Sequence, residues 1–539
     1  MQRLRSINLI LGYAGLTGLI GVTILAFKGL SGFDDAQFDL SLLSDRYIQK
    51  ILGFSLYQAL LSTLISLLIA WPLAHLIYRL NPIGASALLR LCLLAFVMPT
   101  LVVITSVLIL LGPQGFLRSL LWDDWKLFGL NGILIAHVYL NAPLILRILL
   151  QRYQRIPDAT ERLSAQLKLS PVQRFTLVLW PHLRPTLIAL TGLIFILCFN
   201  SFAVVLALGG GPQSTTLELA IYQALKYQFN LTEALTLAWL QFTLAGILFA
   251  LAALWGRVEW LGSSRHSHNW HSPLGPITSR IAYCFYVATW LFLLMPFIAL
   301  LGSLQLERLL QLDLSVLIES LGRSFAIALM ATLIAITLSL LILEPQLRAI
   351  KQEQRIFTAI LQWISTHHLV APAMVLSTGI YILLLSSGTL RDWSYVWLIL
   401  LNALLILPFL QTQLRPSVIN YQAQYARLVS NLRLGVIQRL SIYLRFLIRP
   451  LSAAFALGLL LALGDVAIFA VFGRYDAPTL PWLIYSYAGS YRLAEAAIAS
   501  ALLLSLCVAL LLILERSRRS KRLTLNKRDK KQRSANNGA

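Results

Sequence analysis

Residues 324–343 read SFAIALMATLIAITLSLLIL, twenty consecutive residues without a charged side chain, bounded by Arg323 and Glu344. At a rise of 1.5 Å per residue, a helix of this length spans about 30 Å, the thickness of the hydrocarbon core of a bilayer. Its apolar residues are not confined to one face, as they would be in a surface helix of a soluble protein. This stretch therefore predicts a transmembrane helix.

Similar apolar runs recur along the whole chain. Of its 539 residues, 58% are hydrophobic and 12% are charged, whereas soluble globular chains have about 45–50% and about 25%. We expect transmembrane helices near 7–27, 51–78, 88–111, 130–150, 186–208 and 234–255, and again near 280–302, 322–343, 367–386, 393–413, 451–472 and 493–514. The predicted fold is an all-α polytopic membrane protein with about 12 transmembrane helices.

The Lys and Arg residues indicate how the chain crosses the membrane. In a soluble chain, the formal net charge of +22 would favour nucleic-acid binding. Here the basic residues gather in alternate loops between the apolar runs, which is typical of cytoplasmic loops. We therefore expect no nucleic-acid partner and place both termini in the cytoplasm. The basic tail at 515–539 is expected to contact anionic membrane lipid.

The two halves of the chain repeat one another at a nearly constant offset. Pro143 corresponds to Pro408, and residues 202–205 (FAVV) correspond to 466–469 (VAIF). With six spans each, the halves have the same orientation, so we expect parallel repeats with a pathway between them. The expected organisation is a first half at 1–255, a cytoplasmic linker rich in Gly, Ser and Pro at 256–279, a second half at 280–514 and the tail at 515–539.

Motifs for catalysis are missing from the sequence. A phosphate-binding loop for ATP hydrolysis ends in Gly-Lys-Ser/Thr, and no Gly of this chain is followed by Lys. The His and Asp residues are scattered among the predicted helices, without the convergence that a nucleophile or a metal requires. We expect no catalytic residue, no metal site and no cofactor in this chain.

The longest basic loop of each half lies between its fourth and fifth spans, at 152–185 and 414–450. Residues 162–168 read RLSAQLK, and residues 427–433 read RLVSNLR. A short amphipathic helix, followed by a stretch that re-enters the membrane, suits the docking of a soluble partner. A helix lying on the bilayer surface is the alternative that the basic residues equally favour.

These loops resemble the EAA loops of the permeases of ABC importers. The family pattern is Glu-Ala-Ala, a Gly four positions after the second Ala, and a Pro thirteen positions after that Gly. The positions that the resemblance assigns to contact with an ATPase are Arg162, Ala165, Lys168, Pro181, Arg427, Arg433 and Phe446. The sequence departs from the pattern at several of them. Arg162 and Arg427 stand at the Glu positions, Lys168 and Arg433 at the Gly positions, and Phe446 at the second Pro.

A more particular resemblance lies in residues 208–225, which read LGGGPQSTTLELAIYQAL. This stretch is similar to the thiamine-transporter branch of the same permease family. The resemblance implies import of thiamine and its phosphates across the bacterial inner (plasma) membrane by alternating access. It also implies two copies of a cytoplasmic ATPase subunit, which bind the ATP, and a periplasmic substrate-binding protein. A permease for ferric iron or another small cation is the alternative within the family.

Polar residues within the apolar runs are the candidates for a translocation pathway, because a charge at the centre of a bilayer costs about 2.5–3.5 kcal/mol on insertion scales. Asp465 follows Gly464 in an otherwise apolar span, and its repeat counterparts are Asn200 and Ser201. We interpret these four residues as pathway candidates. A hydrogen bond that only fixes helix packing is the alternative.

The outer end of the fifth span carries a second candidate site. Gly209, Gly210 and Gly211 provide a flexible turn there, and Glu218 follows it. We interpret these residues as candidates for docking the periplasmic binding protein. A helix stop and a solvated loop charge are the alternatives.

An ion-coupled secondary carrier is a different class of protein with two six-helix halves. Ion coupling requires several carboxylates in mid-membrane, and the sequence offers one clear case, Asp465, since Glu344 lies at the end of its span. The ABC importer permease is therefore the favoured function.

Overall fold

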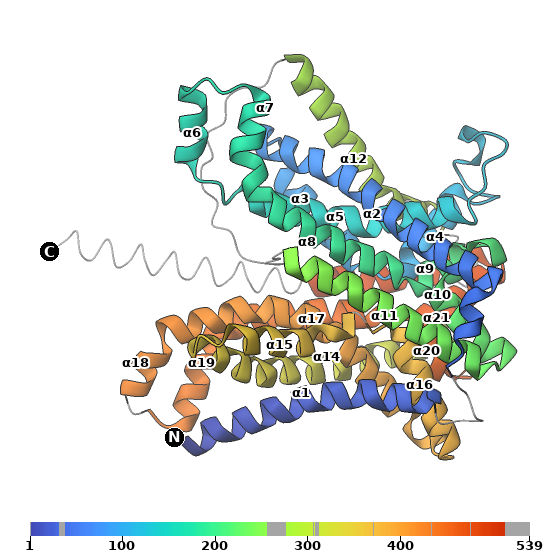
Figure 1. The fold of residues 1–539 in the computed structure, drawn as a ribbon. Coiled ribbons are helices and arrows are strands. Elements are labelled where there is room, and N and C mark those ends of the chain that lie inside the picture. The colour runs from blue at the N-terminus through green and yellow to red at the C-terminus, as the bar shows by residue number, and fades with distance from the viewer. Residues whose placement is uncertain are drawn as a thin grey trace.

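A computed structural model describes residues 2–31, 38–255, 276–304, 307, 312–369, 371–432, 434–474 and 476–512. Throughout these ranges the regular elements are helices (Figure 1), which confirms the predicted all-α class. Most of the predicted linker (256–275) and all of the basic tail (515–539) lie outside the described residues.

The elements of the first half are α1 (Gln2–Ser31), η1 (Leu40–Ser44), α2 (Arg46–Leu80), α3 (Ala85–Val97), α4 (Thr100–Leu111), η2 (Arg118–Leu120), α5 (Leu130–Tyr153), α6 (Asp158–Gln166), α7 (Pro171–Arg174), η3 (Phe175–Leu179), α8 (Trp180–Phe199), α9 (Phe202–Leu208), η4 (Pro212–Ser214), α10 (Leu217–Gln223), η5 (Ala224–Gln228) and α11 (Leu231–Trp255). Those of the second half are α12 (Pro276–Gly302), α14 (Leu314–Lys351), α15 (Arg355–Thr366), η6 (His367–Leu369), α16 (Ala373–Ser386), α17 (Leu390–Gln424), α18 (Ala426–Asn431), α19 (Val436–Leu463), α20 (Ala467–Phe472), α21 (Leu480–Gly489) and a last helix, Leu493–Leu512.

Within the described ranges, ten helices are long and apolar enough to cross a membrane, or eleven if the bent pair α3 and α4 is one span. The chain is thus a polytopic membrane protein, as predicted. The remaining span, expected near 367–386, corresponds to η6 and α16. Because α16 has 14 residues, it is shorter than the ~20 that a straight crossing needs.

The third span of each half is broken at a proline. Helices α3 and α4 meet at an angle of 102°, where Pro99 precedes the first residue of α4. Pro372 precedes α16 in the same way. Proline lacks a backbone N–H and disfavours helical geometry in the preceding residue, so a helix is interrupted at such a position. We expected one helix near 88–111, and the structure instead has two helices there that meet at a bend.

The first helix of each half packs against the other half. Helix α1 contacts α14, α15 and α16 of the second half, and α12 contacts α2, α3 and α4 of the first half. In Figure 1, α1 runs along the α14 and α16 side of the molecule, while α12 lies beside α2 and α3. The two halves are therefore interlocked as well as packed side by side.

Small residues allow the close approach of α1 to α16. A Cβ atom added to Gly379 would overlap the carbonyl group of Ala26, and one added to Gly29 would overlap the carbonyl group of Gly379. Helices in membranes commonly associate through such small residues, because their backbones can then come into direct contact. These glycines hold α1 on the second half.

The repeat has a direct counterpart in hydrogen bonding. The Leu217 N–H, which begins α10, donates to the Ser55 hydroxyl of α2 at 3.0 Å. The Leu480 N–H, which begins α21, donates to the Ser324 hydroxyl of α14 at 2.8 Å. A free N–H group at a helix start requires an acceptor, and both halves supply a buried serine at the same place.

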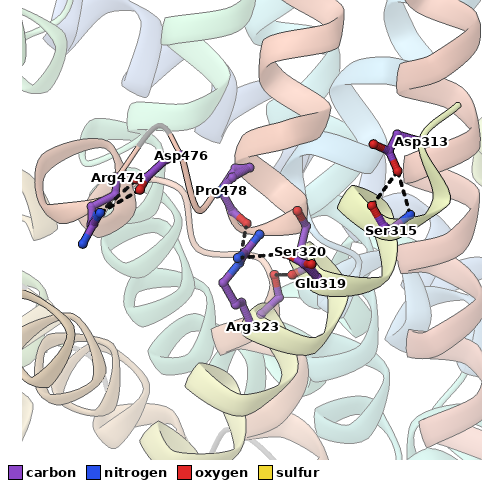
Figure 2. A network of polar contacts seen from close by, with 9 residues as sticks. Asp313, Ser315, Glu319, Ser320, Arg323, Arg474, Asp476 and Pro478 are labelled. Atoms are coloured by element: carbon purple, nitrogen blue, oxygen red, sulfur yellow. Dashed lines mark hydrogen bonds and ion pairs between the residues drawn. The ribbon is translucent and has the colours of Figure 1, made fainter.

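Charged side chains fasten the loop before α21 to the start of α14 (Figure 2). The Arg323 guanidinium donates to the Pro478 carbonyl at 3.2 Å and lies 3.5 Å from the Glu319 carboxylate. Within the loop, Arg474 pairs with Asp476 at 2.7 Å, and its hydrogen bond, together with its charge, lowers the pKa of this carboxyl group. The loop is thereby held beside the Ser324–Leu480 hydrogen bond.

We expect Gly379→Leu to lower the stability of the whole chain, because a larger side chain must separate α1 from α16. Overpacking of this kind costs about 1–3 kcal/mol. The measurement is the temperature at which the detergent-solubilised protein loses its monodisperse elution peak. Gly322→Leu is the matched control, since nothing lies within 4 Å of a Cβ atom added there. Equal melting of the two variants would contradict this account of the α1 contact.

Candidate functional site

The loop at 152–185 is built around Glu161, a residue that our sequence interpretation missed. Its side chain is 1% exposed and forms an ion pair with Arg174 at the end of α7. The Tyr78 hydroxyl of α2 also donates to it, at 3.5 Å. The sequence signal was a carboxylate one position before Arg162, which we had assigned to the Glu position of the motif. The ion pair joins α6 to α7 within the loop, and the Tyr78 hydrogen bond joins α6 to α2.

The outer face of α6 carries the predicted docking residues. Arg162 is exposed and Ala165 is half-buried. Leu163, which lies between Arg162 and Ala165, is 54% exposed. Leu167, which follows Ala165, is 62% exposed. Exposed leucines that form a patch on a short helix mark a surface for a partner rather than part of the core.

Lys168 ends α6 in the left-handed region of backbone space, with φ +50°. Its N–H donates to the Ala165 carbonyl at 3.0 Å, and the Leu169 N–H donates to the Ser164 carbonyl at 3.2 Å. Glycine adopts this conformation without steric strain, whereas for other residues it costs about 1–2 kcal/mol of free energy. The geometry therefore explains why the family pattern has Gly here, and Lys168 keeps the turn without it.

Pro181 lies in the first turn of α8, after the continuous helical stretch that begins at α7. Proline has no N–H group to donate to the preceding turn of this stretch. Four residues later, Pro185 lies within α8, and its repeat counterpart, Pro450, lies within α19. Our sequence interpretation did not use this matched pair, although the same offset relates Pro143 to Pro408.

The second loop repeats the docking face of the first. Leu428 on α18 is 55% exposed and Leu432 just after it is 58% exposed, at the positions that match Leu163 and Leu167. The side chain of Arg427 and all of Arg433 lie outside the described residues. Phe446, at the expected second Pro, instead packs in α19 against Tyr421 and Tyr425, with ring centroids 5.5 and 5.2 Å apart. Aromatic packing thus replaces proline there.

The pathway candidates lie at matched breaks in the fifth span of each half. Asn200 and Ser201 separate α8 from α9, and Gly464 and Asp465 separate α19 from α20. The Asn200 side-chain oxygen accepts from Gln241 at 3.1 Å. A Cβ atom added to Gly464 would lie 3.2 Å from Cα of Pro99, so the second-half break abuts the broken third span of the first half. The second-half break therefore lies at the interface between the halves.

Asp465 accepts two long hydrogen bonds. The Asn402 amide donates at 3.4 Å and the Ile468 N–H donates at 3.5 Å. The residue that matches Asn402 in the first half, His137, instead lies 2.9 Å from the hydroxyl of Ser62. The two halves thus share a polar layer but place a carboxylate in the second half alone.

The candidates for docking the periplasmic binding protein differ in their exposure. Gly210 and Gly211 are exposed and have φ of +71° and +133°, so this turn requires glycine. Gly209 is buried. Glu218 is 1% exposed and faces the protein interior, and its role in docking stays a prediction. It is buried because α10 folds back between the halves, whereas the sequence indicated an external loop.

A small cavity of about 20 Å³ lies between the halves. Its lining comes from α3 and α5 of the first half and from α17 and α19 of the second, with Arg147, Gln151 and Thr412 as the polar groups. A cavity of this size holds about one water molecule.

Comparison with known proteins identifies related chains. A family model described as a binding-protein-dependent transport system inner membrane component matches residues 60–257. The thiamine transport system permease protein ThiP of Escherichia coli (strain K12) is 35% identical over 517 residues, which are 94% of this chain and 96% of that protein.

Other relatives show the same pattern. ThiP of Haemophilus influenzae is 35% identical and covers 92% of this chain and 94% of its own length. ThiP of Brucella abortus (strain 2308) is 32% identical and covers 95% of both. The ferric transport system permease protein FbpB of Actinobacillus pleuropneumoniae is 27% identical over 40% of this chain. Similarity to the ThiP proteins thus extends over both halves.

We expect Glu161→Gln to loosen the loop that carries α6, because it removes the charge that pairs with Arg174. Loss of a charged partner for a buried group costs about 1–3 kcal/mol, so trypsin should cleave after Arg162 and Lys168 about fivefold faster or more. Asp124→Asn, at an exposed carboxylate far from this loop in sequence, is the control. An unchanged cleavage rate would show that the ion pair does not hold the loop.

Substitutions of Lys168 test the left-handed turn. We expect Lys168→Gly to preserve it and Lys168→Val to open it, because a β-branched residue is strained at positive φ. The measurement is the rate at which chymotrypsin cleaves at the exposed Leu167. Gln166→Val is the matched control, since it introduces the same side chain within α6. If Lys168→Val and Gln166→Val are cleaved at equal rates, the turn does not depend on φ at this residue.

Proposed function

The chain belongs to the family of thiamine transport system permease proteins (ThiP), and on this basis we propose that it carries thiamine and its phosphates across the bacterial inner membrane. It is the permease subunit of an importer, a multi-pass inner-membrane protein, and its relatives are transport subunits rather than enzymes. ATP is hydrolysed on two separate ATPase subunits. A periplasmic binding protein delivers the substrate.

The observation that carries this proposal is the matched pair of docking faces. Leu163 on α6 and Leu167 just after it are exposed to nearly the same degree as Leu428 on α18 and Leu432 just after it. In Figure 1 both helices project from the same end of the molecule. Two equivalent apolar faces fit two copies of one partner, as a dimeric ATPase requires. Exposed apolar residues are also the usual anchors of protein interfaces.

The opposite end of the molecule supports closure on the periplasmic side. Lys226 of the first half donates to the carbonyl of Val471 in α20 at 3.0 Å. Its ammonium group also lies 4.6 Å from the ring centroid of Tyr381 in α16, a favourable cation–π distance. Both contacts join the first half to the second. Import by alternating access requires them to break when the outer end opens.

The topology follows from the docking faces and from the distribution of charge. If α6 and α18 contact cytoplasmic ATPases, then α1 begins and the last helix ends on the cytoplasmic side. Arg79 and Arg152, at the ends of α2 and α5, then also lie on that side, in agreement with the positive-inside rule. The substrate enters at the end that carries α10 and α20.

Uptake of radiolabelled thiamine tests the function directly. Cells without their own thiamine importer receive this chain together with its binding protein and its ATPase. We expect accumulation that disappears when the ATPase is omitted. Introducing Leu163→Asp together with Leu428→Asp should abolish it, because charged side chains would be buried at both docking faces.

The matched control for this uptake experiment is Ile83→Asp, which places the same charge at a side chain that is 99% exposed and outside both docking helices. Its uptake should equal that of the wild type. An assembled complex that does not accumulate thiamine would contradict the proposed substrate. Full uptake by the doubly substituted chain would contradict the proposed docking faces.

A further inference from the structure

Glu218 is a buried carboxylate with no evident structural task. It lies in the first turn of α10 and is 1% exposed. Neither of its carboxylate oxygens forms a hydrogen bond of good geometry with any part of the chain that the structure describes. A buried charge without compensation costs several kcal/mol. An ionisable group buried in this way inside a membrane protein is a candidate for a functional role.

The surroundings of Glu218 belong to the other half of the protein. Helix α10 packs against α16, and the carboxylate is close enough to the Met374 N–H, in the first turn of α16, and to the Asp465 carboxylate for their charges to interact. The positive end of a helix dipole is a weak partner compared with a full positive charge. One carboxylate from each half therefore faces the same interface.

The neighbouring cation does not neutralise this pair. Lys226 follows Glu218 in the same segment, but its ammonium group donates to the Val471 carbonyl and lies over the ring of Tyr381. Among the salt bridges of the described ranges, none involves Glu218 or Asp465. The hydrogen bonds to Asp465, at 3.4 and 3.5 Å, are too long to be strong. In the ranges that the structure describes, the pair thus has no cationic side chain as a salt-bridge partner.

The repeat argues against a role in folding alone. Since the matched serine bonds align Leu217 with Leu480, the counterpart of Glu218 is Pro481, which has no polar side chain. The counterpart of Asp465 is Ser201, which is neutral, and its neighbour Asn200 accepts a hydrogen bond from Gln241. Each half folds the same elements without the carboxylate that the other half supplies. The two charges form one asymmetric site at the interface.

We propose that Glu218 and Asp465 form a cation-binding site on the transport path, which takes the positively charged thiazolium ring of thiamine as the substrate passes between the halves. The assignment of thiamine rests on the proposed function. The thiazolium nitrogen is fully substituted and carries no N–H, so it is attracted by charge and donates no hydrogen bond. Carboxylates that have no salt-bridge partner in the described ranges suit such a cation. Because the site draws one residue from each half, relative motion of the halves assembles it and takes it apart.

The test uses the complete importer, with permease, ATPase and an excess of loaded binding protein, reconstituted in proteoliposomes. Thiamine uptake and ATP hydrolysis are measured for Glu218→Gln, Asp465→Asn and Glu218→Asp. Glu319→Gln is the control, since this carboxylate is exposed and belongs to α14. A second substrate, a thiamine analogue with a neutral thiophene ring in place of the thiazolium, separates charge from shape.

We expect Glu218→Gln and Asp465→Asn each to lower thiamine uptake about tenfold, the change that corresponds to one lost interaction of moderate strength. Glu218→Asp keeps the charge and should retain most of the uptake. ATP hydrolysis should persist in all variants, which shows that the complex is assembled. The wild type should transport thiamine faster than the neutral analogue, and Glu218→Gln should lose this preference.

Two results overturn different claims. A wild-type importer that transports thiamine, with Glu218→Gln and Asp465→Asn as active as Glu319→Gln, would overturn the cation site and leave the proposed function intact. The same holds if both variants lower uptake of the thiophene analogue as much as uptake of thiamine, since their effect would then be structural. A wild-type importer that hydrolyses ATP without transporting thiamine would overturn the proposed function itself.

Discussion

In the apolar core of a bilayer, no water is available to pair with a backbone N–H or C=O group, so an unpaired group there costs several kcal/mol. The chain meets this constraint with helices, and it interrupts them at few places. The breaks at Pro99 and Pro372, between α8 and α9, and between α19 and α20 all lie within the protein. Serine hydroxyls pair with the helix starts at Leu217 and Leu480. Irregular backbone at membrane depth is tolerated where protein covers it, and there it can line a path.

The same constraint shapes how the halves hold together. Between apolar helices in lipid, burial of apolar surface gives little net attraction, so close packing and polar contacts must provide it. The exchanged helices α1 and α12 supply packing, with Gly29 and Gly379 at the closest approach. Lys226 supplies a polar contact at one end. An interlocked pair of halves can rock about its interface without coming apart, which is the motion that alternating access requires.

Hydrophobic runs and basic loops allowed the fold class, the spans and the repeat to be predicted from the sequence. They did not indicate the exchange of α1, because the periodicity of a helix identifies its apolar face and not the partner of that face. Pro99 and Pro372 could have indicated the helix breaks from the sequence. We did not use them, because the apolar runs around them are long enough for a whole helix. Glu161 was missed by one position, and the burial of Glu218 was not predicted because the glycine turn before it indicated an external loop. The roles of the loop, pathway and docking candidates stay predictions.

Movement of the two halves against each other is the central claim, and a distance measurement tests it most directly. Spin labels at Ile83→Cys and Lys351→Cys mark the loop that follows α2 and the end of α14, with the exposed Cys284 replaced by serine. Double electron–electron resonance on the assembled importer compares the distance between the labels with and without trapped ATP. The account predicts a shorter distance when ATP closes the ATPases. An unchanged distance distribution in a complex that binds ATP would contradict it.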